Sequence, residues 1–145
     1  MVPLWSWIVL GSVAYCIALW YLVLWILAVS SGWRKLSRRF YVPAPLSAEP
    51  GQPTMARIGA VRYNGALKIA MESRGLFLAP YRIFRPFHPP LLIPWSEIQI
   101  GEATGRMFAG SVLRFAAVPG VWIAFPQHVL DILRTQIAER GTFDP

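Results

Sequence analysis

The chain has 145 residues, 55% of them hydrophobic, and a formal net charge of +7. The charge is uneven along the chain: residues 1–33 contain no Asp, Glu, Lys or Arg, whereas residues 46–145 carry ten Lys or Arg and seven Asp or Glu. A protein that binds nucleic acid concentrates its positive charge along one helix or stripe. No such run occurs here, so we expect no nucleic acid as a partner.

The first expected element is one transmembrane helix within residues 1–33. The stretch Leu4–Val29 is interrupted only by two serines and one glycine. At about 1.5 Å per residue it is roughly 39 Å long, whereas a bilayer core needs about 30 Å. The alternative is a cleavable signal peptide, with Ala28-Val29-Ser30 as the candidate cleavage site. A signal peptide has a charged start and a shorter apolar core, so the spanning interpretation is favoured.

Basic residues directly after the helix predict its orientation. No Lys or Arg precedes the helix, and positive flanks stay on the cytoplasmic side of a membrane. We therefore expect the N-terminus outside and the C-terminal domain in the cytoplasm. Aromatic and basic side chains are also expected at the two membrane interfaces, where they contact headgroups and anionic lipid. These candidate interface residues are Trp5, Trp7, Trp33, Arg34, Lys35, Arg38 and Arg39.

Three further aromatic residues, Trp20, Tyr21 and Trp25, are expected deep in the membrane, away from the interfaces. Rings at that depth either face lipid or pack against a partner helix. These three residues are therefore candidate partner contacts.

Residues 34–54 are expected to form a basic flank and a linker. Pro43, Pro45, Pro50 and Pro53 exclude a helix and disfavour a central strand. An extended spacer of this kind allows the domain to stand off the bilayer or to fold back against it.

Residues 55–145 are expected to fold as a small cytoplasmic domain of short strands. The first hairpin is predicted from 57–63 and 66–71, joined at Asn64-Gly65, because that dipeptide is the strongest short hairpin signal. Residues 72–75 then predict a turn. The later strands are expected at 76–80, 91–94, 97–100, 112–117 and 121–125. Residues 82–84 are an alternative continuation of the strand at 76–80. The last two strands are joined by Val118-Pro119-Gly120.

The last segment changes to a helical period. Val129, Ile132, Leu133 and Ile137 lie on one face of a helix expected from about residue 126 to residue 140. Several antiparallel strands and one amphipathic helix together predict a small β-barrel or sandwich with one end closed by the helix.

Two local sequences carry a resemblance to a known family. Gly75-Leu76-Phe77-Leu78, followed by Leu92-Ile93-Pro94-Trp95-Ser96-Glu97-Ile98, resembles the pattern of small membrane proteins with a PH-like domain. The resemblance covers about residues 55–140. It implies a mainly β, α+β domain of the GRAM or bacterial PH type, capped by a C-terminal helix. It also implies a bacterial inner membrane, and it supplies little chemistry.

Catalytic and metal-binding patterns are weak. His88 and His128 lie about 40 residues apart, and Cys16 lies within the apolar helix, so no spacing resembles a metal site. Ser96, His128 and Asp131 provide the residue types of a triad, but nothing like a nucleophile elbow surrounds Ser96. We therefore expect a protein that is not an enzyme and has no cofactor.

Segment 84–92 combines aromatic residues, an arginine and three prolines in a predicted loop. A rigid loop of this kind binds partners at a low entropic cost, and its candidate contacts are Phe84, Arg85, Phe87 and His88. The alternative is that its apolar side chains pack into the domain core.

Two functions follow as expectations. The first is an accessory or scaffold subunit of a membrane protein complex, which makes protein–protein contacts through the PH-like domain. The alternative is a membrane-tethered module that binds anionic lipid headgroups. Its candidate lipid contacts are Arg62, Lys68, Arg74, Arg82 and Arg85.

Overall fold

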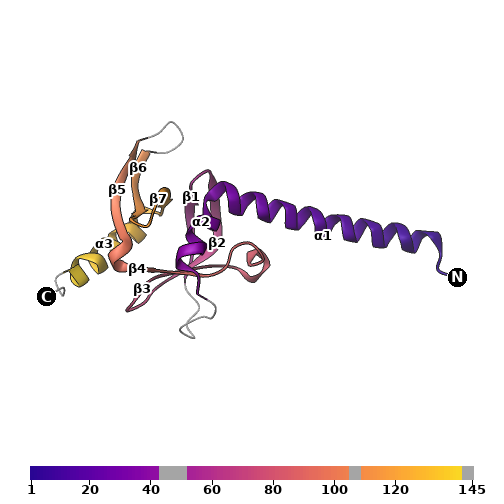
Figure 1. Cartoon of the computed structure of the whole chain (residues 1–145), viewed down its shortest axis with the longest axis horizontal. Helices are drawn as coiled ribbons and strands as arrows, with labels where there is room; N and C mark the ends of the chain where they lie inside the picture. The colour runs from indigo at the N-terminus through magenta and orange to yellow at the C-terminus, as the bar shows by residue number, and fades with distance from the viewer. Residues whose placement is uncertain (43–51, 105–108, 142–145) are drawn as a thin grey trace.

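The computed structural model describes residues 1–42, 52–104 and 109–141 (Figure 1). Most of the expected proline-rich linker, residues 43–51, lies outside the described residues. The helices are α1 (Leu4–Ser31), α2 (Trp33–Phe40) and α3 (Gln127–Gly141), with short 3-10 helices η1 (Arg82–Phe84) and η2 (Trp95–Glu97). The strands are β1 (Gln52–Ile58), β2 (Val61–Met71), β3 (Gly75–Pro80), β4 (Leu91–Pro94), β5 (Ile98–Thr104), β6 (Ala109–Phe115) and β7 (Val118–Ala124).

Helix α1 extends away from the rest of the molecule as a single rod (Figure 1). It has 28 residues, and its length and apolar composition are sufficient to cross a membrane. The few polar groups do not interrupt it: the Ser12 hydroxyl donates a hydrogen bond to the Ile8 carbonyl, 2.8 Å away, within the helix. Most of its apolar side chains are exposed, which is the arrangement that a lipid environment favours.

Helix α2 begins directly after α1 and occupies part of the expected basic flank. Its apolar residues Trp33, Leu36 and Phe40 follow a helical spacing and are buried in the domain. The four basic residues of α2 are exposed on its other faces. The domain therefore incorporates a segment that the sequence pattern assigned to the helix end and the linker.

The described strands form one antiparallel sheet in the order β4-β3-β2-β1-β7-β6-β5. The sheet is not closed, because β4 and β5 are its two edges, so the expected barrel is instead an open sheet. Among the described residues, two pairs join β1 to β7, Arg57 with Ala124 and Ile58 with Ile123. The expected mainly β domain with a C-terminal helix is confirmed at this level.

The first hairpin turns at a different place from the one predicted. Ile58 pairs with Val61, so the turn is Gly59-Ala60, and β2 continues through Asn64-Gly65. Gly59 and Gly65 both have positive φ, at 54° and 67°. Gly65 therefore uses its conformational freedom in a bulge within β2, where the pairing with β1 shifts register. The Asn64-Gly65 hairpin prediction was wrong.

Other predictions were confirmed or adjusted by a few residues. The turn after β2 is closed by paired hydrogen bonds between the backbones of Glu72 and Gly75, and β3 follows as expected. Segment 82–84 is the helix η1 and not a strand. The β6–β7 hairpin turns before Val118, and Val118-Pro119-Gly120 belongs to β7.

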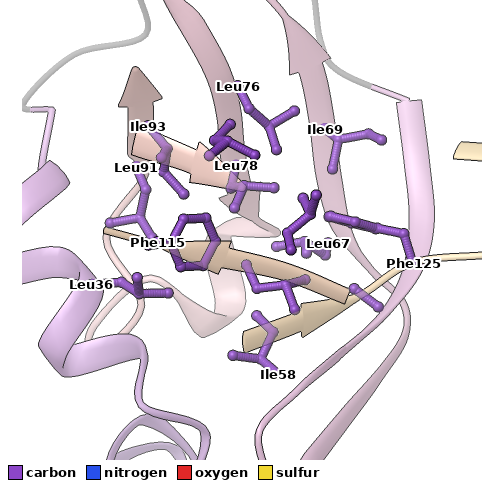
Figure 2. Packing of buried hydrophobic residues seen from close by; sticks show 14 of the residues in the cluster. Leu36, Ile58, Leu67, Ile69, Leu76, Leu78, Leu91, Ile93, Phe115 and Phe125 are labelled. Carbon is purple, nitrogen blue, oxygen red and sulfur yellow. The ribbon is translucent and has the colours of Figure 1, made fainter. Parts of the chain in front are cut away.

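The core lies between the two halves of the sheet and receives side chains from α2 and α3. Leu67 and Leu78 of one half, and Phe115 of the other, point into the same interior (Figure 2). From α3, Val129, Leu130 and Leu133 join this cluster, whereas Ile132 is half exposed, so the predicted helix face is rotated slightly.

Candidate functional site at the helix–domain junction

The last two turns of α1 are part of the domain. Leu24, Ala28 and Ser31 are buried, and they recur at the spacing of one helical face. The preceding residues of α1 are exposed, apart from Ser6, which is half-buried. The domain therefore holds the end of α1 by packing and not through a spacer.

Gly32 makes the corner between α1 and α2. Its φ is 81°, a left-handed conformation, and its amide donates to the Val29 carbonyl 3.3 Å away. A Cβ added at Gly32 would lie 2.7 Å from a methyl group of Val121 in β7. Glycine is therefore required here both for the backbone conformation and for the close approach of the sheet.

Trp33 lies in the core, although the sequence placed it at the inner membrane interface. It is fully buried, and its Nε1 donates to the Pro89 carbonyl at 3.0 Å. Its ring contacts Tyr63 and His88, with centroids 6.2 Å and 5.5 Å away. By sequence pattern alone, a tryptophan at the end of an apolar run fits either a membrane interface or a protein core. Here the domain encloses it.

A chain of polar groups runs through the same place. The Tyr63 hydroxyl lies 3.2 Å from Ser31 Oγ and 3.0 Å from His88 Nε2. With Nε2 protonated, His88 donates to the Tyr63 oxygen, Tyr63 donates to Ser31, and Ser31 donates to the Ala28 carbonyl. We call Ser31, Trp33, Tyr63 and His88 the junction cluster.

Burial sets the ionisation of the junction cluster. It lowers the pKa of His88, against the opposing effect of the nearby Phe84 backbone, and it raises the pKa of Tyr63, against the hydrogen bond with Ser31. His88 Nδ1 makes no hydrogen bond of normal geometry within the described residues. The neutral forms are favoured, and enclosure from solvent gives the cluster a structural role in joining α1 to β2.

Segment 81–90, which we call the aromatic loop, connects β3 to β4 and lies alongside α1 (Figure 1). Phe84 contacts Trp20 with ring centroids 5.8 Å apart, and Phe87 contacts Tyr21 edge-on at 6.2 Å. Two sets of residues that the sequence assigned to separate partner surfaces therefore meet within one chain.

The remaining candidate contacts differ in their exposure. His88, proposed as a partner contact, is fully buried, because the loop turns it inward against Tyr63. Arg85 is exposed, Phe84 and Phe87 are half-buried, and Trp25 is 44% exposed on α1.

The candidate lipid-binding cations do not form one pocket. Arg62 lies beside the β1–β2 turn, whereas Arg74 lies in the β2–β3 turn at the opposite end of β2. Arg82 and Arg85 are exposed on the aromatic loop. The Lys68 ammonium lies over the Tyr81 ring, 4.9 Å from its centroid.

The candidate interface residues lie at both ends of the apolar rod. Trp5 and Trp7 are exposed near the start of α1. Arg34, Lys35, Arg38 and Arg39 form the exposed face of α2, directly beyond the junction.

An open groove between β1, β2 and the segment that joins β7 to α3 was not predicted. It combines apolar side chains with two arginines, and no motif marks it because its residues come from distant parts of the sequence. Its lining residues are Met55, Ala56, Arg57, Arg62, Ala124, Phe125 and Pro126.

Comparisons with known proteins identify no relative. No protein-family model matches the chain, and neither does any curated protein or solved structure. Within residues 1–42, 52–104 and 109–141, no three His, Cys, Asp or Glu side chains gather in a way that could hold a metal ion.

Because His88 is buried in the junction cluster, we expect the free energy of unfolding of the domain to depend on pH. The unfolded imidazole takes up a proton near its usual pKa of 6.5, whereas folded His88 does so only at lower pH. The unfolded state therefore binds more protons in that interval, and stability falls as the pH drops below about 6.5, by at most about 1.4 kcal/mol per pH unit. Denaturant unfolding of the full chain in detergent, repeated across this range, measures the slope.

Two variants distinguish the contribution of His88 to this slope from that of other groups in the chain. His88→Gln is expected to remove this part of the slope and to destabilise the protein at neutral pH. His128→Gln, at an exposed position at the start of α3, is expected to leave the slope unchanged. An unchanged slope in His88→Gln contradicts the assignment.

Proposed function

We propose that the chain is a single-pass membrane protein whose domain is a non-enzymatic accessory or scaffold unit, fixed against the cytoplasmic face. The observation that carries the proposal is the burial of Leu24, Ala28 and Ser31 by the domain, while the rest of α1 remains an exposed apolar rod. A surface of that length and composition is stable in lipid and unfavourable in water.

The same burial favours a permanent span over a cleaved signal sequence. Cleavage after Ser30 would remove Leu24 and Ala28, which are 0% and 2% exposed in the folded domain. A signal sequence is absent from the mature protein, so its side chains are not expected to be part of the folded domain.

The exposed basic face of α2 supports the orientation. Arg34, Lys35, Arg38 and Arg39 follow the apolar rod directly, and positive flanks remain in the cytoplasm. The resemblance to PH-like domains implies a meander, a loop-rich middle, a final hairpin and a helix. The chain runs through a meander of β1 to β4, then β5, the β6–β7 hairpin and α3, and this order supports the PH-like proposal. The PH-like assignment and the bacterial inner membrane are part of the proposal.

The groove beside β1 is the surface that we assign to a protein partner. Met55 is 47% exposed, and Arg62 is exposed beside it. An apolar floor beside the exposed Arg62 fits a segment with apolar and acidic side chains, because an arginine pairs with a carboxylate in a planar geometry.

The assembly state of the full chain in its native membrane tests this function. We expect the chain, extracted in mild detergent, to migrate with other proteins at constant stoichiometry, well above its own 16.3 kDa. The double variant Met55→Asp/Arg62→Glu, at exposed positions, is expected to migrate as a monomer. Arg74→Glu, at the opposite end of β2, is the matched control and is expected to remain assembled. A wild-type monomer contradicts the proposal.

Lipid binding is the second candidate, and the position of Arg62, Arg82 and Arg85 favours it. Arg62 follows the β1–β2 turn, in which Gly59 approaches the Ser31 carbonyl at the end of α1. Arg82 and Arg85 lie on the loop beside α1. Native mass spectrometry of the detergent-solubilised chain distinguishes the candidates. A monomer that retains anionic lipid, and loses it in Arg62→Gln/Arg82→Gln/Arg85→Gln, supports the lipid module and argues against the scaffold.

A further inference from the structure

Helix α1 is longer than a bilayer core. Its 28 residues measure about 42 Å, which exceeds the roughly 30 Å of hydrocarbon by about eight residues. The domain encloses α1 from Leu24 onward, on one face. The excess length therefore belongs at the C-terminal end, inside the domain, and the membrane boundary lies well before Ser31.

The exposed aromatic residues of α1 mark the same boundary. Trp33 is buried in the core, so it cannot contact headgroups. Trp20, Tyr21 and Trp25 are 38%, 46% and 44% exposed. The distance along α1 from Trp5 to Trp25 is about 30 Å, the thickness of the hydrocarbon core. Trp25 therefore lies at the level at which aromatic belts form, and Trp20 and Tyr21 lie about 6–8 Å deeper in the bilayer.

The aromatic loop lies at this level. Phe84 packs against Trp20 and Phe87 against Tyr21, which places the loop beside the part of α1 that the bilayer surrounds. In Figure 1 the loop containing η1 projects from the sheet along α1 toward its N-terminal end. Ile83 is 59% exposed on this loop.

We propose that the aromatic loop inserts into the cytoplasmic leaflet as a second membrane attachment, with Ile83 in the lipid. The loop continues the apolar surface of α1, so the occupant that fits it is the same bilayer. Arg82 and Arg85 flank Ile83 and Phe84 and are exposed, so their stems lie along the apolar region and their guanidinium groups reach the phosphates. The domain is then partly embedded and does not stand off the membrane. This inference rests on the proposed span of α1.

A depth measurement in vesicles tests the insertion. The full chain, with Cys16→Ala and Ile83→Cys, is labelled with an environment-sensitive fluorophore and reconstituted in phosphatidylcholine and phosphatidylglycerol with brominated acyl chains. Apolar faces at an interface enter about 5–10 Å, so we expect bromines near the headgroup to quench about half of the emission or more, and deep bromines to quench less.

The matched control is Ile132→Cys in the same background. Ile132 is also an exposed isoleucine, 50% accessible, but it lies on α3 at the far side of the domain from α1 (Figure 1). Its label is expected to show no quenching. Equal, water-like emission from positions 83 and 132 overturns the insertion.

A label on the native Cys16 tests the membrane span of α1 separately from the insertion of the aromatic loop. A label on Cys16, in the otherwise unchanged chain, is expected to be quenched most by deep bromines if α1 spans the bilayer. Quenching at Cys16 without quenching at position 83 overturns only the loop insertion. Absence of quenching at Cys16 overturns both the span and the insertion.

Discussion

Replacing Trp33 with alanine is expected to lower the free energy of unfolding by about 3–5 kcal/mol, the usual cost of deleting a large buried aromatic side chain. Trp33 is fully buried, packs against Tyr63 and His88, and donates to the Pro89 carbonyl. Deletion leaves a cavity and an unpaired carbonyl between α2 and the aromatic loop. Because small domains are stable by about 5–15 kcal/mol, this is a large part of the total.

Denaturant unfolding of the full chain in detergent, followed by the circular dichroism of the sheet, measures the effect. Trp7→Ala is the control, because Trp7 is 63% exposed near the start of α1 and contributes nothing to the domain core. If Trp33 were an interface residue, both variants would unfold like the wild type. A loss below about 1 kcal/mol for Trp33→Ala contradicts its assignment to the core.

Removal of residues 1–42 is expected to abolish cooperative unfolding of the domain. This truncation deletes Trp33, Leu36 and Phe40, all part of the main core cluster. Each deletion of a large buried side chain costs about 2–5 kcal/mol, so the three together match or exceed the stability of a small domain. It also removes the bridge between Tyr41 and Leu91 at the edge of β4.

A chain of residues 24–145 is the comparison for the truncation. It keeps α2 and the face of α1 that contains Leu24, Ala28 and Ser31. In the same detergent we expect it to unfold in one cooperative transition, whereas residues 43–145 give a broad, weak transition. Similar transitions for the two chains would mean that the domain begins after α2, and would contradict the rigid junction.

Local signals in the sequence predicted the elements that depend on local chemistry. The turn 72–75, the strand β3 and the helix α3 follow from residue type and periodicity, and the structure confirms them. The long apolar rod also follows from composition alone. These features need no knowledge of distant contacts.

The structure contradicts several predictions that depended on contacts between residues distant in the sequence. Gly65 does adopt positive φ, but pairing with β1 places it in a bulge and not in the hairpin turn. Trp33 was predicted at the membrane interface and His88 on a contact loop, yet distant segments enclose both of them. Trp20 and Phe84 are 64 positions apart, and no local pattern indicates that they meet. The strand register and the enclosure of side chains by distant segments therefore determine where the residues of the candidate site lie.

Retention of the whole chain in the membrane is the most direct test of the account. Membranes that contain the protein are washed at high pH, which releases peripheral proteins, and the mass of the chain in the pellet is measured intact. The account predicts that the chain stays in the pellet with α1 still attached. A soluble chain that begins near Ser31 would show that α1 is a cleaved signal sequence, and would contradict both the span and the proposed junction.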